Sequence, residues 1–232
     1  MSKISLKHSS GNSMSIGAPA TNPASDLELK LPATVGTAGQ VLQNSSTPGT
    51  LEFAAGGDYA KLATAASDDN VSSIVHEGID FSVYRGLYFM GGLIPATNNT
   101  QINFYWRSGG TELVLDQYLT SYTRVFDSTP EAEHADNQGR LQLCSDTGDD
   151  DDQGAYFWIF MFPISNTADG TSNGIGNYIN WQCVHRNGSD NYRSIAGSGL
   201  YDRRNVSPNG FSIMPGSGDF DHYSYSLYGI KR

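Results

Sequence analysis

A series of strand-length segments after residue 57 sets what this chain can fold into. Each segment is rich in aromatic and β-branched residues, and clusters of Gly, Pro, Asn and Ser separate them as turns. The segments cover residues 83–90, 101–107, 141–144, 155–162, 178–186 and 223–230. With about eight strands in total, the pattern predicts an all-β fold over residues 58–232, an antiparallel, jelly-roll-like β-sandwich.

Alternation within the segments indicates that most strands bury one face. Ile102, Phe104 and Trp106 recur at every second position, which is the period of a half-buried strand. Residues 155–162 break this rule because every one of them is apolar. If one face of this strand lies in the core, the other face needs a cover, since large exposed apolar patches usually mark contacts. We predict that a second copy of the chain covers it, through Tyr156, Trp158, Phe160 and Phe162.

Composition favours one soluble β-domain with a short appendage. Only 16% of the 232 residues are charged, 26 are Gly, and helical stretches rich in Ala, Leu, Glu and Lys are missing. No window approaches the about 18 consecutive apolar residues of a membrane span. Polar residues follow the first six residues, where an export signal would have its apolar core. We therefore expect a soluble protein without membrane insertion.

The net charge of −10 is unevenly distributed. Residues 1–57 are balanced, and their charged residues are Lys3, Lys7, Lys30, Asp26, Glu28 and Glu52. The whole acidic excess therefore lies in residues 58–232. Because phosphate binding requires a stripe of Lys and Arg, an acidic domain without one argues against nucleic acid as a partner.

Residues 1–57 are expected to form an extended attachment arm. Leu27, Leu29 and Leu31 alternate with Glu28 and Lys30, as in a half-buried strand. A single strand is not stable in water, so another copy or a docking partner must cover its apolar side. The alternative is a disordered linker rich in Gly, Ser and Thr. The predicted anchoring residues are Leu27, Leu29, Leu31, Val41, Leu42 and Phe53.

The sequence predicts no metal or organic cofactor. Cys144 and Cys183 are the only cysteines, and they are expected to be buried as small hydrophobes, with a disulfide left open. The histidines show no pair at zinc-ligand spacing. Asp146 opens an acidic loop at 146–152, for which a solvated role is favoured. If this loop binds calcium, the candidate ligands are Asp149 and Asp151, since alternate residues share a side.

No catalytic constellation stands out, so the chain is expected not to be an enzyme. No Gly-x-Ser-x-Gly elbow lies between a strand and a helix, and no spacing selects a pair of carboxylates. Gly197-Ser198-Gly199 is interpreted as a turn. A loop-rich stretch offers aromatic, acidic and arginine side chains of the kind that contact sugars, although they also suit packing at a sandwich edge. These candidate glycan contacts are Tyr192, Arg193, Tyr201, Asp202 and Arg203.

Several short stretches resemble virion proteins of bacteriophages. Residues 18–26, Ala-Pro-Ala-Thr-Asn-Pro-Ala-Ser-Asp, and residues 36–40, Gly-Thr-Ala-Gly-Gln, are similar to words in the stalks of phage fibre and head-decoration proteins. The turn at 94–98 and the final strand ending at 231 look like the C-terminal domain of marine-phage structural proteins. The chain thus resembles a short fibre or head-decoration-type protein of a tailed, podophage-like phage. It lacks the coiled coil or repeated shaft of long tail fibres.

The resemblance implies a role in the virion, with assembly in the host cytoplasm. A homotrimer is the common arrangement of fibre heads, although the sequence pattern does not distinguish three-fold from five-fold symmetry. Residues 1–57 would bind another virion protein of the head or tail, and the sandwich would face outward, toward host surface polysaccharide. A capsid decoration or cement protein is the alternative. A glycan depolymerase is a second alternative with the least support in the sequence.

Overall fold

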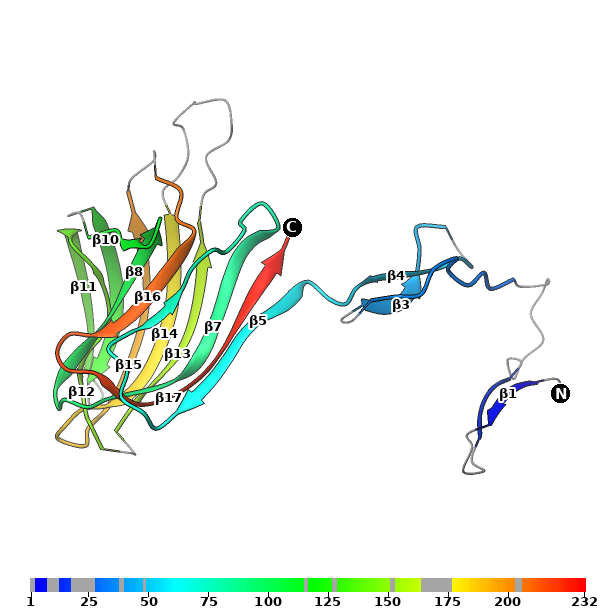
Figure 1. The fold of residues 1–232 in the computed structure, drawn as a ribbon. Helices are drawn as coiled ribbons and strands as arrows, with labels where there is room; N and C mark the ends of the chain where they lie inside the picture. Colours follow the sequence, from blue (N-terminus) through cyan, green and yellow to red (C-terminus); the bar gives the residue numbers. More distant parts are fainter. Residues whose placement is uncertain are drawn as a thin grey trace. The chain divides into compact units, whose positions relative to one another are not determined.

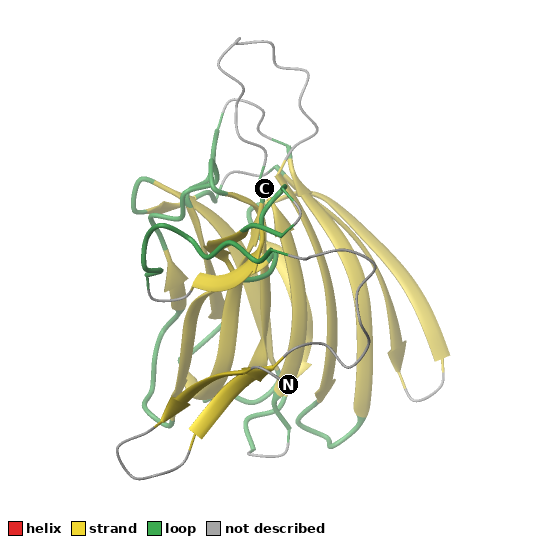
Figure 2. Ribbon diagram, turned by 90° about the vertical axis from the view of Figure 1, so that its right-hand side faces the viewer, coloured by secondary structure: helices red, strands yellow, loops and turns green. Residues whose placement is uncertain are grey.

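The computed structural model describes residues 3–7, 13–17, 28–37, 40–47, 49–114, 117–126, 129–150, 153–163, 177–202 and 206–232. The chain divides into two compact units, residues 1–56 and 57–232 (Figure 1). The described residues are strands, turns and loops without any helix (Figure 2). Accordingly, no helix in this part of the chain is long and apolar enough to cross a membrane. The all-β, antiparallel class expected from the sequence is confirmed.

Unit 1 contains two short antiparallel hairpins. One pairs β1 (Lys3–Lys7) with β2 (Ser13–Gly17), and the other pairs β3 (Gln40–Asn44) with β4 (Leu51–Ala55). The second hairpin joins two of the expected arm segments, because Leu42 lies opposite Phe53.

The strand expected around residues 27–31 is not a full strand. Among the described residues there, only Lys30 pairs, through a single parallel bridge to Thr50. Leu29 and Leu31 are 61% and 73% exposed. Leu27 lies outside the described residues. The strand prediction is therefore wrong in extent, since period-two leucines alone supply no neighbouring strand to pair with.

Unit 2 consists of two antiparallel sheets. The larger sheet has eight strands in the order β11-β10-β15-β14-β13-β7-β17-β5. Its strands are β5 (Tyr59–Ser67), β7 (Tyr84–Pro95), β10 (Tyr118–Phe126), β11 (Thr129–Gln138), β13 (Ala155–Phe162), β14 (Asn177–Arg186), β15 (Tyr192–Tyr201) and β17 (Phe220–Lys231). The smaller sheet has the order β12-β8-β16-β6, with β9 beside β8. Its strands are β6 (Ile74–His76), β8 (Thr100–Ser108), β9 (Thr111–Glu112), β12 (Leu141–Thr147) and β16 (Gly210–Pro215).

One hydrophobic core lies between the two sheets. Phe104 of β8 stacks on Phe211 of β16 with ring centroids 5.8 Å apart, and Phe211 meets Phe89 of the larger sheet edge to face at 6.4 Å. Trp181 of the larger sheet donates its Nε1–H to the carbonyl oxygen of Leu143 in the smaller sheet, at 2.8 Å. These contacts couple the sheets through both apolar packing and a buried hydrogen bond.

All the strand segments expected from the sequence are present, as parts of β7, β8, β12, β13, β14 and β17. Ile102, Phe104 and Trp106 are fully buried, which confirms the alternation argued for β8. The structure adds strands that the sequence pattern does not predict, including β15, whose sequence favours loop and turn.

Glycines make room for large side chains where strands pack closely. A Cβ on Gly197 of β15 would lie 2.4 Å from the ring of Trp181, and one on Gly199 would lie 2.0 Å from Leu141. Gly has a low preference for strands, so these two residues make β15 difficult to predict from the sequence. The packing nevertheless requires a residue without a side chain at both positions.

Two adjacent glycines of β7 give a matched test of this packing. A Cβ on Gly91 would lie 2.4 Å from the carbonyl oxygen of Ser224, which is backbone and cannot turn away. A Cβ on Gly92 would meet the ring of Tyr156 at 3.0 Å, and that ring is exposed and can rotate. We expect Gly91→Ala to lower the free energy of unfolding by about 2 kcal/mol or more, and Gly92→Ala by less than about 1 kcal/mol, in urea titrations. Equal effects would contradict this account of β7.

Candidate functional site

Five neighbouring strands of the larger sheet present a largely uncharged surface on the side turned away from the core. We call it the outer face and define it by the alternate residues, on the side away from the core, of five neighbouring strands, β7, β13, β14, β15 and β10, which the strand registers align in rows. Its residues are Gly86, Tyr88, Met90, Gly92, Tyr156, Trp158, Phe160, Phe162, Tyr178, Asn180, Gln182, Val184, Ser194, Ala196, Ser198, Leu200, Leu119, Ser121, Thr123 and Val125. None of these residues carries a charge, in a chain whose net charge is −10; the first charged residue in the β14 row is Arg186, at the end of the strand.

β13 supplies the most apolar strip of the outer face. Its burial alternates along the strand. Four residues point into the core: Ala155, Phe157, Ile159 and Met161. On the opposite side, Tyr156, Trp158 and Phe162 are 61%, 38% and 39% exposed. Phe160 is half-buried because it stacks on Tyr88 of β7, with ring centroids 4.6 Å apart. The structure thus places the four residues predicted as an interface side by side on one exposed surface.

Glycines of β7 fit the rings of β13. A Cβ on Gly86 would lie 2.9 Å from the ring of Phe162, just as one on Gly92 would touch Tyr156. The rings therefore lie over the glycines, which shields that stretch of backbone and leaves the ring faces toward solvent. The strip is therefore a continuous aromatic surface along β13.

Polar amides border this aromatic strip. Tyr88, Trp158, Phe160, Asn180 and Gln182 line an open pocket of about 270 Å³ on the outer face. Ring faces beside amide donors and acceptors can contact either the apolar and polar groups of another protein surface or the CH and OH groups of a sugar.

The candidate glycan contacts do not come together as one site. β15 passes through them, so consecutive side chains point to opposite sides of the sheet. Tyr201 is fully buried and packs against Tyr118, with ring centroids 4.8 Å apart. Tyr192 is 62% exposed at the other end of the strand. The proposed cluster was wrong in treating this stretch as a loop.

The polar members of that set serve local structure where they are described. Arg193 forms an ion pair with Asp146 at 2.5 Å. The backbone N–H of Asp202 donates to the carbonyl oxygen of Gln117 at 3.0 Å. Arg203 lies outside the described residues.

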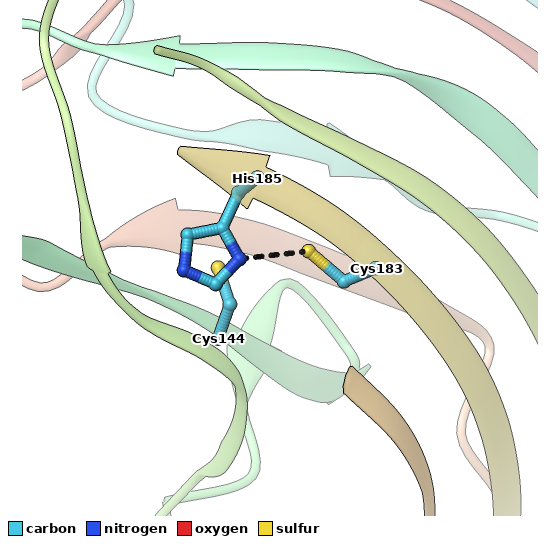
Figure 3. A group of neighbouring side chains, drawn as sticks. All are labelled: Cys144, Cys183 and His185. Atoms are coloured by element: carbon cyan, nitrogen blue, oxygen red, sulfur yellow. Dashed lines mark hydrogen bonds between the residues drawn. The ribbon is translucent and has the colours of Figure 1, made fainter. Parts of the chain in front are cut away.

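A buried group of sulfur and nitrogen atoms lies between the sheets. The group consists of Cys144 from β12 and of Cys183 and His185 from β14 (Figure 3). Each residue offers one potential ligand atom, and the three atoms lie within 4.8 Å of one another. Cys183 Sγ lies 3.7 Å from His185 Nδ1, and His185 Nε2 lies 2.9 Å from the carbonyl oxygen of Ser145. The sequence reasoning missed this group, although the Cys-x-His spacing on a strand puts both side chains on one face. Both cysteines are buried, as expected, and they are free in this structure.

Known proteins offer no comparison for this site. Comparison of the chain with protein-family models, with curated proteins and with solved structures finds nothing similar.

The acidic loop does not form a comparable cluster among its described residues. Asp146 is engaged by Arg193, and Asp149 is half-buried. Asp151, the other calcium candidate, lies outside the described residues. In the part of the chain that the structure describes, the only group of three or more His, Cys, Asp or Glu side chains able to share an ion is the one at Cys144.

Burial lowers the pKa of His185 to about 4, although its hydrogen bond to Ser145 acts in the opposite direction. Burial also raises the pKa of the Cys183 thiol. In the unfolded chain this histidine takes up a proton near its ordinary pKa of about 6.5, whereas in the folded chain it stays neutral down to about pH 4. The contribution of His185 to the free energy of unfolding should therefore be fully present above pH 6.5 and be lost as the pH falls toward 4. We expect a loss of about 3 kcal/mol from this residue over that window.

The pH dependence is measured by urea unfolding in a buffer that chelates metals. His185→Gln should flatten the profile between pH 6.5 and pH 4 relative to the wild type, because Gln does not titrate. Parallel profiles for the two proteins would show that His185 is not held neutral by the fold.

Proposed function

We propose that the chain is a structural protein of a virus particle, a short homo-oligomeric appendage whose sandwich associates with further copies through the outer face. The observation that carries the proposal is the uncharged surface built around Tyr156, Trp158, Phe160 and Phe162. Soluble proteins seldom leave such a surface to water, and aromatic side chains with few charges are typical of interface cores. The proposed role is structural and not enzymatic.

The size of the outer face supports the proposal. Five strands about 4.8 Å apart and seven residues long at about 3.3 Å per residue cover roughly 550 Å² in projection. Side-chain relief and the flanking Tyr228 and Tyr59, which continue the ring cluster beside Tyr88, enlarge it. A standard protein interface buries about 800 Å² per partner, so the face is of the right order.

The absence of charge on the outer face also favours association of identical copies. A chain with a net charge of −10 repels its own copies, so an interface between them is best placed where charges are missing. A self-complementary face gives a two-fold pair, whereas the trimer expected for fibre heads needs each face to contact two neighbours. The number of copies is therefore the quantity to measure.

Residues 1–57 complete the proposal as the arm that binds another virion protein of the head or tail, after assembly in the host cytoplasm. The exposed Leu29, Leu31, Val41 and Leu42 support this part, because they offer apolar contacts to a partner. The proposal keeps the jelly-roll interpretation of the sandwich, which the pairing of β7 with β17 and of β8 with β16 supports, since strands from both ends of the domain lie side by side.

A truncated chain tests where assembly resides. Residues 57–232 form a compact unit, so this fragment is expected to fold and to contain the same number of copies as the full-length protein in sedimentation experiments. If the fragment sediments as a monomer and the full chain does not, the copies associate through the arm and not through the outer face. A full-length protein that associates only with capsid subunits would favour the capsid decoration alternative.

Glycan binding is a second candidate, favoured by the pocket between Trp158, Phe160, Asn180 and Gln182. Ring faces stack on sugar CH groups, and amides bond to hydroxyls. Because a copy bound to the outer face would cover this pocket, the two functions compete for one surface. Binding to a glycan array by a monomeric protein, lost in an Asn180→Ala/Gln182→Ala variant, would favour this candidate over self-association.

A further inference from the structure

We propose that Cys144, Cys183 and His185 bind a Zn²⁺ ion that links the two sheets of the sandwich. Cys144 comes from β12 of the smaller sheet, whereas Cys183 and His185 come from β14 of the larger sheet (Figure 3). The inference is independent of the outer face, which lies on the other side of the larger sheet.

The spacing of the donor atoms suits zinc. Zn–S and Zn–N bonds of about 2.3 and 2.0–2.1 Å at tetrahedral angles place the sulfur and nitrogen about 3.6 Å apart. The observed distance from Cys183 Sγ to His185 Nδ1 is 3.7 Å. All three donor atoms lie within 4.8 Å of one another, so small side-chain adjustments close the site.

The histidine is oriented as a ligand. Its Nε2 can only donate to the carbonyl oxygen of Ser145, at 2.9 Å, because a carbonyl accepts hydrogen bonds and does not donate them. In the neutral ring the lone pair is then on Nδ1, which faces Cys183. Metal-binding histidines almost always donate their second N–H in this way, which fixes the ring and its tautomer.

Charge balance selects the ion. Binding releases the two thiol protons to solvent, and Zn²⁺ with two thiolates and a neutral imidazole has no net charge. This matters because Cys144, Cys183 and His185 are at most 2% exposed, and an uncompensated charge there is costly. Cu⁺ with the same ligands would leave one negative charge. The buried Thr147 hydroxyl lies 3.2 Å from Cys144 Sγ, so it can hydrogen-bond to this sulfur as a thiolate.

The test is the metal content and the stability of the full-length protein. Protein produced with zinc in the medium, under reducing conditions, should retain about one zinc ion per chain after dialysis. Refolding with Co²⁺ should give the intense near-ultraviolet absorption of thiolate-to-cobalt charge transfer. A strong chelator should lower the melting temperature of the zinc-loaded protein.

Variants separate a metal site from ordinary core packing. Cys183→Ser and His185→Gln should lower zinc affinity by more than roughly 100-fold, since loss of only a ligand's hydrogen-bond partner costs about 10–100-fold. His76→Gln is the matched control, because His76 is a partly buried histidine that bonds to Tyr225 away from the group. It should keep full zinc content.

Three results would overturn the proposal. The first is wild-type protein that binds neither zinc nor cobalt. The second is equal metal content in the wild type and Cys183→Ser. The third is a Cys144–Cys183 disulfide that forms in reducing buffer, because the oxidised sulfurs cannot serve as thiolate ligands.

Discussion

Replacing Trp158 by Asp is expected to dissociate the oligomer while the sandwich stays folded. Trp158 lies at the centre of β13 on the outer face and is 38% exposed, so its removal leaves the core intact. Central tryptophans of an interface typically contribute about 2–4 kcal/mol, and the new carboxylate would also have to be buried without a partner. We expect the association constant to fall by roughly 30-fold to 1,000-fold or more, measured by sedimentation over a range of protein concentrations.

Val75→Asp is the matched control for this variant. Val75 of β6 is an apolar residue with a similar exposure, 41%, but it belongs to the smaller sheet. This substitution should leave the mass in solution unchanged. A Trp158→Asp protein with wild-type mass, or a Val75→Asp protein that dissociates, would show that assembly does not use the outer face.

The second large effect is expected from Phe157 and Phe160, two phenylalanines on opposite sides of β13. Phe157 is fully buried between the sheets, so Phe157→Ala should lower the free energy of unfolding by about 3–5 kcal/mol through lost transfer energy and a cavity. Phe160 stacks on Tyr88 at the surface, so Phe160→Ala should cost the monomer about 1 kcal/mol. Urea unfolding at low protein concentration measures both.

The reversed order would contradict the assignment of faces in β13. At high protein concentration Phe160→Ala should additionally weaken association, whereas Phe157→Ala should affect assembly only by unfolding the protein. A comparison at two concentrations thus separates core from interface for residues of the same type on the same strand.

Aromatic strands of the sandwich could be predicted from sequence because their burial pattern is local. In β8, alternate apolar residues are enough to specify the inner side, and in β13 the unbroken apolar run indicated two covered faces. The sequence alone therefore identifies the four outer residues of β13. Whether a second copy covers them depends on a partner surface, which no pattern within one strand reveals.

Other elements depend on contacts between residues far apart in the chain. β15 contains Gly197 and Gly199, whose local preference is for turns, and it becomes a strand because Trp181 and Leu141 fill the space above them. For the same reason the sequence groups Tyr201 with Tyr192 as a candidate glycan contact, although the structure buries Tyr201 against Tyr118. Sequence spacing left open whether Cys144 and Cys183 lie together and gave no sign that His185 joins them, since β12 and β14 belong to different sheets.

The most direct test of the central claim is the molar mass of the full-length protein by light scattering coupled to size-exclusion chromatography, at micromolar concentration. The account predicts a single species whose mass is a whole multiple, two or more, of the 25.1 kDa chain. A well-folded species that remains at 25.1 kDa as the concentration rises would contradict it, because the outer face would then be exposed to water in the functional protein.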